Sequence, residues 1–155
     1  MRRASHVRRE GDWNPALAVD RVVLDACDRQ RRRIVLTGEC GTTFLLDLAL
    51  PVTLCDGDGL ELDDGAMVQV AGRPEPVVEI TAPTPLALVR IAWHLGNRHA
   101  EVQICENRLR IRCDHVLEQM TTVLGAEVVL LEAPFEPEPV ASNREHVHRH
   151  QDDDT

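Results

Sequence analysis

Short runs in which apolar and polar residues alternate fill the first half of the chain, and they predict β-strands. The runs cover residues 19–24, 33–37, 42–48, 52–54, 61–62 and 67–70. Turns such as Thr37-Gly38, Cys40-Gly41 and Asp63-Asp64-Gly65 separate them, and Gly and Asp supply the backbone angles that tight turns need. The pattern predicts a small all-β domain over residues 1–75.

The pattern changes at Arg73-Pro74-Glu75-Pro76, where each proline removes a backbone donor and disfavours helix in the residue before it. Beyond this boundary we predict a strand, a helix, two strands, a second helix and a last strand. They cover residues 77–81, 84–95, 101–105, 109–112, 114–124 and 127–131. This β-α-β-β-α-β order predicts a ferredoxin-like domain over residues 76–139, and therefore an α+β protein.

The predicted helices have clear end signals. Thr84-Pro85 opens the first with a side-chain cap followed by proline, and Asp114 caps the second. Gly96 or Asn97 is suited to the left-handed residue that closes the first helix. The proline-rich strap 133–139 is predicted to stay extended, with Phe135 as an anchor against the domain.

Residues 140–155 have almost no apolar side chains, so this tail is predicted to be disordered without metal. It carries His146, His148 and His150 at alternate positions. An extended backbone sends alternate side chains to one side, so three imidazoles can face one cation. Zinc, copper and nickel prefer such ligands. The alternative is the remnant of a tag, although an ordinary tag repeats histidine without spacers.

Charge and composition exclude some classes of function. The 26 acidic residues outnumber the 17 basic ones and give a formal charge of −9, which argues against a general nucleic-acid binder. No apolar run is long enough for a membrane span, so we expect a cytoplasmic protein with no membrane partner. The arginine run 29–33 is predicted to be a solvated turn. Five cysteines without a CxxC pair are predicted to be mostly buried thiols, namely Cys27, Cys40, Cys55 and Cys105.

Four candidate metal ligands lie within 22 residues of the second predicted domain: His94, His99, Cys113 and His115. His94 is predicted to face the surface near the end of the first helix, and His99 lies in the loop that follows. Cys113 and His115 are two residues apart, so they can point the same way and share a cation. A lone exposed histidine is usually a solvated residue, but this clustering favours metal chemistry.

Three local sequences carry a resemblance to a known family: Trp93 to His99, Leu109 to Met120, and Ala133 to Glu138. They resemble the UreE urease accessory proteins, nickel chaperones that serve urease maturation. The resemblance implies an N-terminal β domain that contacts partners and a C-terminal domain that binds metal and dimerises. It also implies that His99 faces its symmetry mate in the homodimer and that tail histidines complete the site.

The same resemblance places His94, Cys113 and His115 in a peripheral metal site. Position 113 is Cys where some relatives have His, and the softer thiolate shifts such a site toward copper or zinc. Three tail histidines, where some relatives carry many more, favour metal delivery over storage.

We therefore expect a nickel metallochaperone and not an enzyme. Its cargo is Ni(II), for which Cu(II) or Zn(II) compete, and its expected partners are the urease accessory complex, including its GTPase component, and apo-urease. Only neutral imidazole binds metal, so affinity is expected to fall below about pH 6.5. One alternative is a small metal-dependent hydrolase that uses His94, His99 and His115, although the sequence has no nucleophile motif. The other is an interaction module that buffers metal passively.

Overall fold

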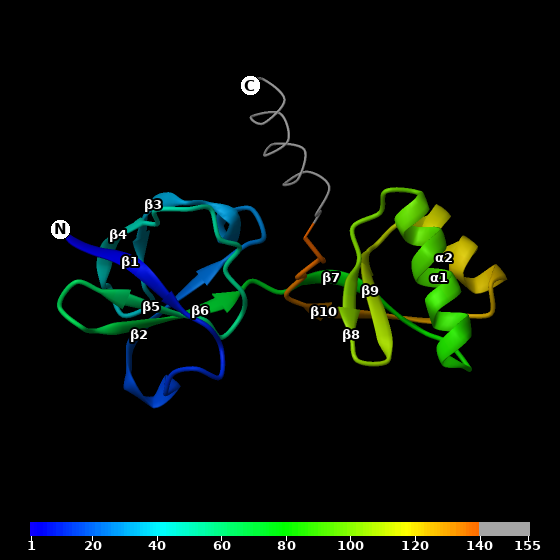
Figure 1. The fold of residues 1–155 in the computed structure, drawn as a ribbon, viewed down its shortest axis with the longest axis horizontal. Helices are drawn as coiled ribbons and strands as arrows, with labels where there is room; N and C mark the ends of the chain where they lie inside the picture. The colour runs from blue at the N-terminus through cyan, green and yellow to red at the C-terminus, as the bar shows by residue number, and fades with distance from the viewer. Residues whose placement is uncertain (140–155) are drawn as a thin grey trace, which may run out of the picture. The chain divides into compact units, whose positions relative to one another are not determined.

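The computed structural model describes residues 1–139, which divide into two compact units (Figure 1). The first unit contains residues 1–77 and 131–136, and the second contains residues 78–130 and 137–139. No helix in the described part of the chain has the length and hydropathy of a membrane span.

The first unit is built on a six-stranded sheet with the order β2-β6-β5-β1-β4-β3. Its strands are β1 (Arg2–Arg8), β2 (Ala18–Leu24), β3 (Arg33–Thr37), β4 (Thr43–Asp47), β5 (Gly59–Leu62) and β6 (Met67–Gly72). Two short 3-10 turns, Pro15–Leu17 and Asp28–Gln30, connect parts of it. The inward side chains of alternating strand positions form one aliphatic core around Phe44, Leu46 and Leu60. The predicted all-β unit is confirmed.

Two local predictions for this unit are wrong. Strand β1 was not expected, because Arg2-Arg3 and Arg8 hide its pattern and Ala4 is its only fully buried residue. It is nevertheless central, since it pairs in parallel with β4 and antiparallel with β5. Residues 52–54 form no strand, although Leu54 is buried in the core.

The arginine run 29–33 was predicted to be solvated, but Arg29 is only 2% exposed. Its Nη2 donates a 3.0 Å hydrogen bond to the carbonyl oxygen of Phe135, and its Nη1 lies 3.7 Å from the carboxylate of Glu136. Phe135 is fully buried, but it belongs to the first unit, so it anchors the strap there and not against the second domain as predicted. A buried guanidinium needs carbonyl and carboxylate partners, and here the strap that follows the last strand supplies them.

The second unit has a four-stranded sheet with the order β10-β7-β9-β8 and two helices on one face (Figure 1). Its elements are β7 (Glu75–Thr81), α1 (Pro85–Asn97), β8 (Gln103–Cys105), β9 (Arg108–Arg112), α2 (His115–Val123) and β10 (Glu127–Ala133). Side chains of β7, β9 and both helices share one core, with Ile80, Ile91 and Ile111 at its centre. The predicted β-α-β-β-α-β order and ferredoxin-like arrangement are confirmed.

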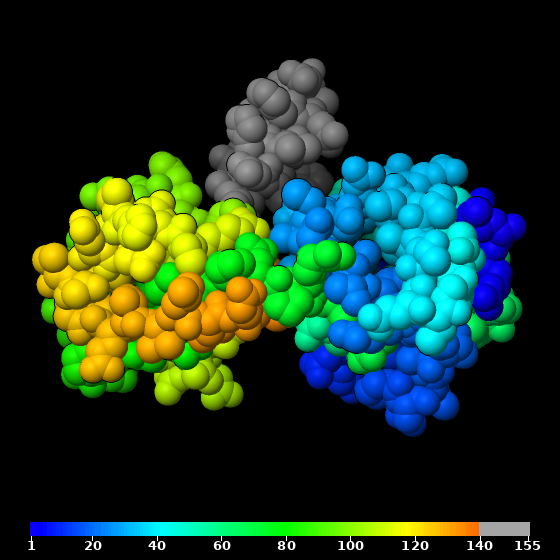
Figure 2. Space-filling view, turned by 180° about the vertical axis from the view of Figure 1, so that it is seen from behind, coloured from blue at the N-terminus to red at the C-terminus, as the bar shows by residue number. Residues whose placement is uncertain are grey.

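Strand β10 forms an edge of this sheet and lies open at the surface, as the orange residues in Figure 2 show. Val129 and Leu130 are exposed there.

The prediction of buried cysteines is wrong. Cys27 and Cys40 are exposed, and Cys55 and Cys105 are half-buried. Cys40 lies in the turn between β3 and β4, where the chain is held by its backbone: the amide of Cys40 donates a 2.8 Å hydrogen bond to the buried carboxylate of Asp20. The same carboxylate raises the pKa of the Cys40 thiol. Burial and the neighbouring carboxylate of Glu136 raise the pKa of the Cys55 thiol to about 11.

Candidate metal centre

The end of helix α1 positions His99, the main candidate ligand. Thr84 caps the start of this helix by accepting a 3.1 Å hydrogen bond from the amide of Ala87. Leu95, on the inward face, is fully buried and fixes the last turn against the sheet. The helix continues to Asn97, and Arg98 is its C-cap residue.

His99 follows the cap and has φ = 59°, in the left-handed region. The amide of His99 donates to the carbonyl of Gly96 at 3.0 Å, and that of Ala100 donates to Leu95 at 3.1 Å. These two bonds make a Schellman motif. The left-handed residue predicted at Gly96 or Asn97 is therefore His99, because the helix extends two residues further than the glycine signal indicated.

The end of α2 provides an internal comparison. The amides of Gly125 and Ala126 donate to Thr122 and Thr121, both at 3.0 Å, which is the same pattern. There the left-handed residue is glycine, Gly125, with φ = 94°. A left-handed residue with a Cβ costs roughly 1–2 kcal/mol, so α1 carries a histidine where glycine would be the less strained choice.

The His99 side chain is exposed. The chain just before the tail is bound close to His99 in sequence. The amide of Glu138 donates a 2.8 Å hydrogen bond to the carbonyl of Val102, which is three residues after His99. The predicted ligands His146, His148 and His150 lie outside the described residues.

Cys113 and His115 flank the cap of α2 and are both exposed. The carboxylate of Asp114 accepts hydrogen bonds from the amides of Val116 and Leu117, at 2.9 and 3.1 Å. This cap holds Asp114 in an extended conformation, with φ = −156° and ψ = 111°. An extended residue sends its two neighbours to the same side, so the backbone favours the predicted pairing of Cys113 with His115.

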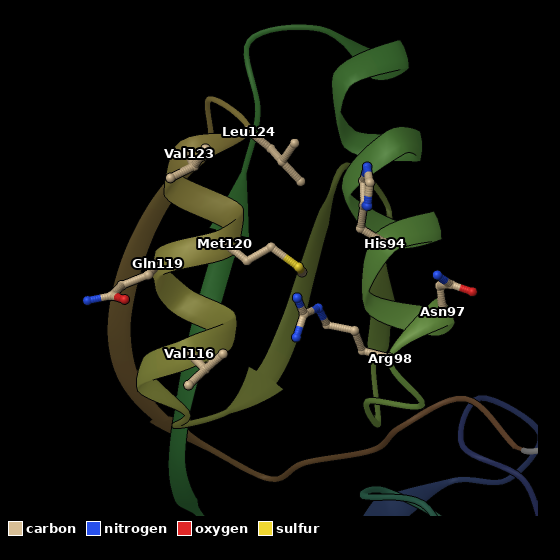
Figure 3. A pocket seen from close by; sticks show the side chains of 8 residues that line it. All are labelled: His94, Asn97, Arg98, Val116, Gln119, Met120, Val123 and Leu124. Atoms are coloured by element: carbon tan, nitrogen blue, oxygen red, sulfur yellow. The ribbon is translucent and has the colours of Figure 1, made fainter.

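His94 is half-buried and lies in a groove between α1 and α2 (Figure 3). Its ring makes an edge-to-face contact with Trp93, with centroids 5.1 Å apart. Within residues 1–139, no three His, Cys, Asp or Glu side chains gather closely enough to hold a metal ion. The protomer therefore does not bring His94, Cys113 and His115 together as a three-ligand cluster.

Comparison with known families shows which family the chain belongs to. A family model described as "UreE urease accessory protein, C-terminal domain" matches residues 75–155. A second, described as "UreE urease accessory protein, N-terminal domain", matches residues 2–72. The chain belongs to the UreE family.

Curated UreE relatives agree with both matches. The urease accessory protein UreE of Rhodopseudomonas palustris is 52% identical over 138 residues, which cover 89% of this chain and 65% of the relative. That of Bradyrhizobium sp. is 51% identical over 138 residues, with 89% and 66% covered. That of Ruegeria pomeroyi is 40% identical over 144 residues, with 93% of each covered. The matches thus span slightly less than two thirds of the first two relatives. These UreE names describe an accessory protein and not an enzyme, in agreement with the prediction.

Sequence reasoning identified the UreE resemblance and predicted His99 as a ligand, but it missed two structural features near these residues. The first is the left-handed backbone of His99, which the sequence Gly96-Asn97 masks with a stronger stop signal. The second is the basic wall of the groove. Arg90, His94 and Arg98 recur every fourth residue, a spacing that places side chains on one face of a helix, and this signal was available in the sequence.

Proposed function

We propose that the protein is a nickel metallochaperone. A homodimer binds Ni(II) through paired His99 side chains and tail imidazoles, and then passes the ion to the urease maturation machinery in the cytoplasm. The expected partners are the urease accessory complex, including its GTPase component, and apo-urease. Family membership supports the urease role, since the relatives are named urease accessory proteins.

The observation that carries this proposal is the backbone of His99. Its left-handed conformation is one that glycine adopts without the strain that a Cβ atom causes. Strain of this kind clusters at functional sites, where the surrounding structure sustains it. Nothing in the helix end requires an imidazole, because the Schellman hydrogen bonds use only backbone atoms. An exposed, strained histidine is best explained by a ligand that it binds.

The surface of α1 supports dimerisation. Leu86, Val89 and Trp93 are 58%, 63% and 63% exposed, and their spacing aligns them on the outward face of the helix. Gly96 continues this face, and a Cβ there would meet nothing within 4 Å. The exposed apolar stripe therefore leads to His99. A two-fold axis near the end of α1 would bring two copies of His99 together, because a symmetric interface duplicates each contact.

The anchoring of the tail supports the contribution of its histidines. Val102 holds Glu138 by a backbone hydrogen bond, and His99 is three residues from Val102, at most ~10 Å along the chain. His146 is eight residues beyond Glu138, and eight residues span up to ~27 Å. The tail imidazoles can therefore reach a metal at His99 of either protomer.

Release of the metal follows from the same arrangement. Imidazoles on an exposed turn and on a tail can be exchanged one at a time for the ligands of a partner. Nitrogen donors bind Cu(II) more tightly than Ni(II), so selectivity must come from metal supply and from docking to the partner. Cys113 with His115 is proposed as a weaker peripheral pair that favours Cu(II) or Zn(II).

The test is a calorimetric nickel titration combined with mass determination by light scattering. Three variants are compared with the intact chain: His99→Asn, the triple variant His146→Ala/His148→Ala/His150→Ala, and His6→Ala as a matched control. Asparagine keeps the left-handed backbone at position 99 and removes the imidazole. His6 is another exposed histidine, on β1.

We expect about one tight nickel per dimer, lost in His99→Asn, weakened in the tail variant and unchanged in His6→Ala. Nickel binding that survives His99→Asn and disappears only with the tail variant would mean that the tail is an independent chelator. That result would contradict the proposal of a nickel site shared by two protomers and would favour passive metal buffering.

A further inference from the structure

The groove between α1 and α2 has a volume of about 460 Å³ and two different walls (Figure 3). The α1 wall is polar and basic, with His94, Asn97 and Arg98. The α2 wall contributes the apolar side chains of Val116, Met120 and Val123, with Gln119 between them. Val116 and Val123 are 61% and 85% exposed. The basic wall of this surface suits a negatively charged segment.

The basic wall belongs to a longer stripe along α1. Arg90, His94 and Arg98 recur every fourth residue. Most other arginines of the described chain form ion pairs, such as Arg110 with Glu79 and Arg112 with Glu101. Within residues 1–139, neither Arg90 nor Arg98 lies within ion-pair distance of a carboxylate. In a chain of net charge −9, these two cations are available to an acidic segment.

We propose that the acidic segment Asp152-Asp153-Asp154 of the same chain docks on this groove against Arg98 and Arg90. Charge complementarity selects this occupant, because no other three consecutive acidic residues occur in the sequence. The length also fits. Asp152 is fourteen residues beyond Glu138, enough for up to ~47 Å, and Glu138 is held at Val102, four residues from Arg98.

Docking places the tail histidines at the metal site. His150 is two residues before Asp152, and Arg98 is directly before His99. A tail whose carboxylates pair with Arg98 therefore holds its imidazoles beside His99 before nickel arrives, which raises their effective concentration. This role rests on the proposed function, whereas the docking itself does not. The ion pairs are exposed, so salt screens them, and the tail can release when a partner competes.

The test is amide NMR of the full-length protein without metal, in the presence of EDTA. The probes are the amides of Val116, Gln119 and Val123, which line the groove and stay unmutated. Spectra of the intact chain are compared with those of Asp152→Asn/Asp153→Asn/Asp154→Asn, Arg98→Gln and the matched control Arg73→Gln, an exposed arginine of the other unit. Each is recorded at low salt and in 0.5 M NaCl.

We expect the triple variant, 0.5 M NaCl and Arg98→Gln each to move these amides toward the same undocked positions, while Arg73→Gln does not. Reversing the charges of both partners, with Arg98→Glu combined with Asp152→Lys/Asp153→Lys/Asp154→Lys, should restore the docked positions. Unchanged groove amides in the triple variant would overturn the proposal. So would amides that respond to protein concentration and not to tail charge, because a second copy would then cover the groove.

A nickel titration adds the functional readout. With every histidine retained, the triple variant should bind nickel about three- to tenfold more weakly at low salt, and the difference should vanish in 0.5 M NaCl. If His99→Asn binds nickel normally while the groove amides still report docking, the proposed function fails and the docked tail stands. If docking is absent while His99 still binds nickel, the docking proposal fails and the proposed function stands.

Discussion

The guanidinium of Arg29 donates a 3.0 Å hydrogen bond to the carbonyl oxygen of Phe135, although 106 residues separate them in the sequence. The side chain of Phe135 is fully buried beside this bond. The carboxylate of Glu136 has two partners in this unit. It lies 3.7 Å from Nη1 of Arg29, and it accepts a 3.1 Å hydrogen bond from the amide of Asp56. The strap after β10 is thus part of the first unit's hydrogen-bonding network.

We expect Arg29→Met to lower the free energy of unfolding by about 3 kcal/mol, measured by urea denaturation. Methionine fills part of the space but leaves the carbonyl of Phe135 and the carboxylate of Glu136 without their cation. The matched control is Arg31→Met, since Arg31 is 60% exposed and has only a local ion pair with Asp28. That variant should stay within about 0.5 kcal/mol of the parent. Equal losses in both variants would contradict this account of the strap.

The carboxylate of Asp20 predicts an acid-sensitive first unit. It accepts hydrogen bonds from the amides of Arg21, Cys40 and Thr42, at 2.7, 2.8 and 2.9 Å. Burial raises the pKa of Asp20, but these hydrogen bonds outweigh it and hold the pKa well below its usual range. A carboxyl whose pKa is lower in the folded than in the unfolded state stabilises the fold above the unfolded value, about 3.9, and loses this contribution as pH falls through the folded value.

Asp20→Asn should therefore destabilise the protein by about 1–3 kcal/mol at pH 7, and the difference from the parent should shrink below about pH 4. Denaturant titrations at a series of pH values measure this. Asp12→Asn is the control, because Asp12 is also an acidic residue of the first unit but is exposed. A deficit that stays constant down to pH 2 would show that the charge of Asp20 is not what holds the turn.

The sequence allowed the second unit to be predicted almost completely, because its signals are local. Thr84-Pro85 and Asp114 are helix caps, and both cap hydrogen bonds are present. Apolar alternation identified β7, β9 and β10. Each of these signals acts over a few residues, so no knowledge of the tertiary structure was needed.

What could not be predicted depends on distant partners. Strand β1 is polar along most of its length and is a strand because β4 and β5 pair with it. Arg29 looks like its solvated neighbours until the strap reaches it. His99 was predicted to be a ligand through family resemblance, but its backbone conformation depends on how far α1 continues beyond Gly96.

The left-handed conformation of His99 predicts different effects of substitution on folding stability and on nickel binding. His99→Gly should fold with a free energy of unfolding equal to or slightly above that of the parent, because glycine adopts the left-handed region without strain, as Gly125 does at the end of α2. His99→Val should lose about 1–2 kcal/mol, since a β-branched residue is strongly disfavoured there. Both should lose tight nickel binding. Urea unfolding and calorimetry on the same samples distinguish the two effects, and a destabilised His99→Gly would refute the strain argument.

The exposed stripe of α1 gives the last prediction. If Leu86, Val89 and Trp93 form the dimer interface, Val89→Glu places a charge where two apolar surfaces meet, and a buried unpaired charge is strongly unfavourable. We expect this variant to be monomeric by light scattering at concentrations where the parent is a dimer. Its fold should remain intact, because Val89 is 63% exposed and outside the core.

Leu50→Glu is the matched control, because Leu50 is also an exposed apolar residue, 73% exposed, but belongs to the first unit. It should leave the mass unchanged. The monomeric Val89→Glu variant should also bind nickel more weakly although every histidine is retained, because each site then has only one His99. A variant that is monomeric yet binds nickel with parental affinity would separate dimerisation from the metal site, and a variant that remains dimeric would move the interface away from this face of α1.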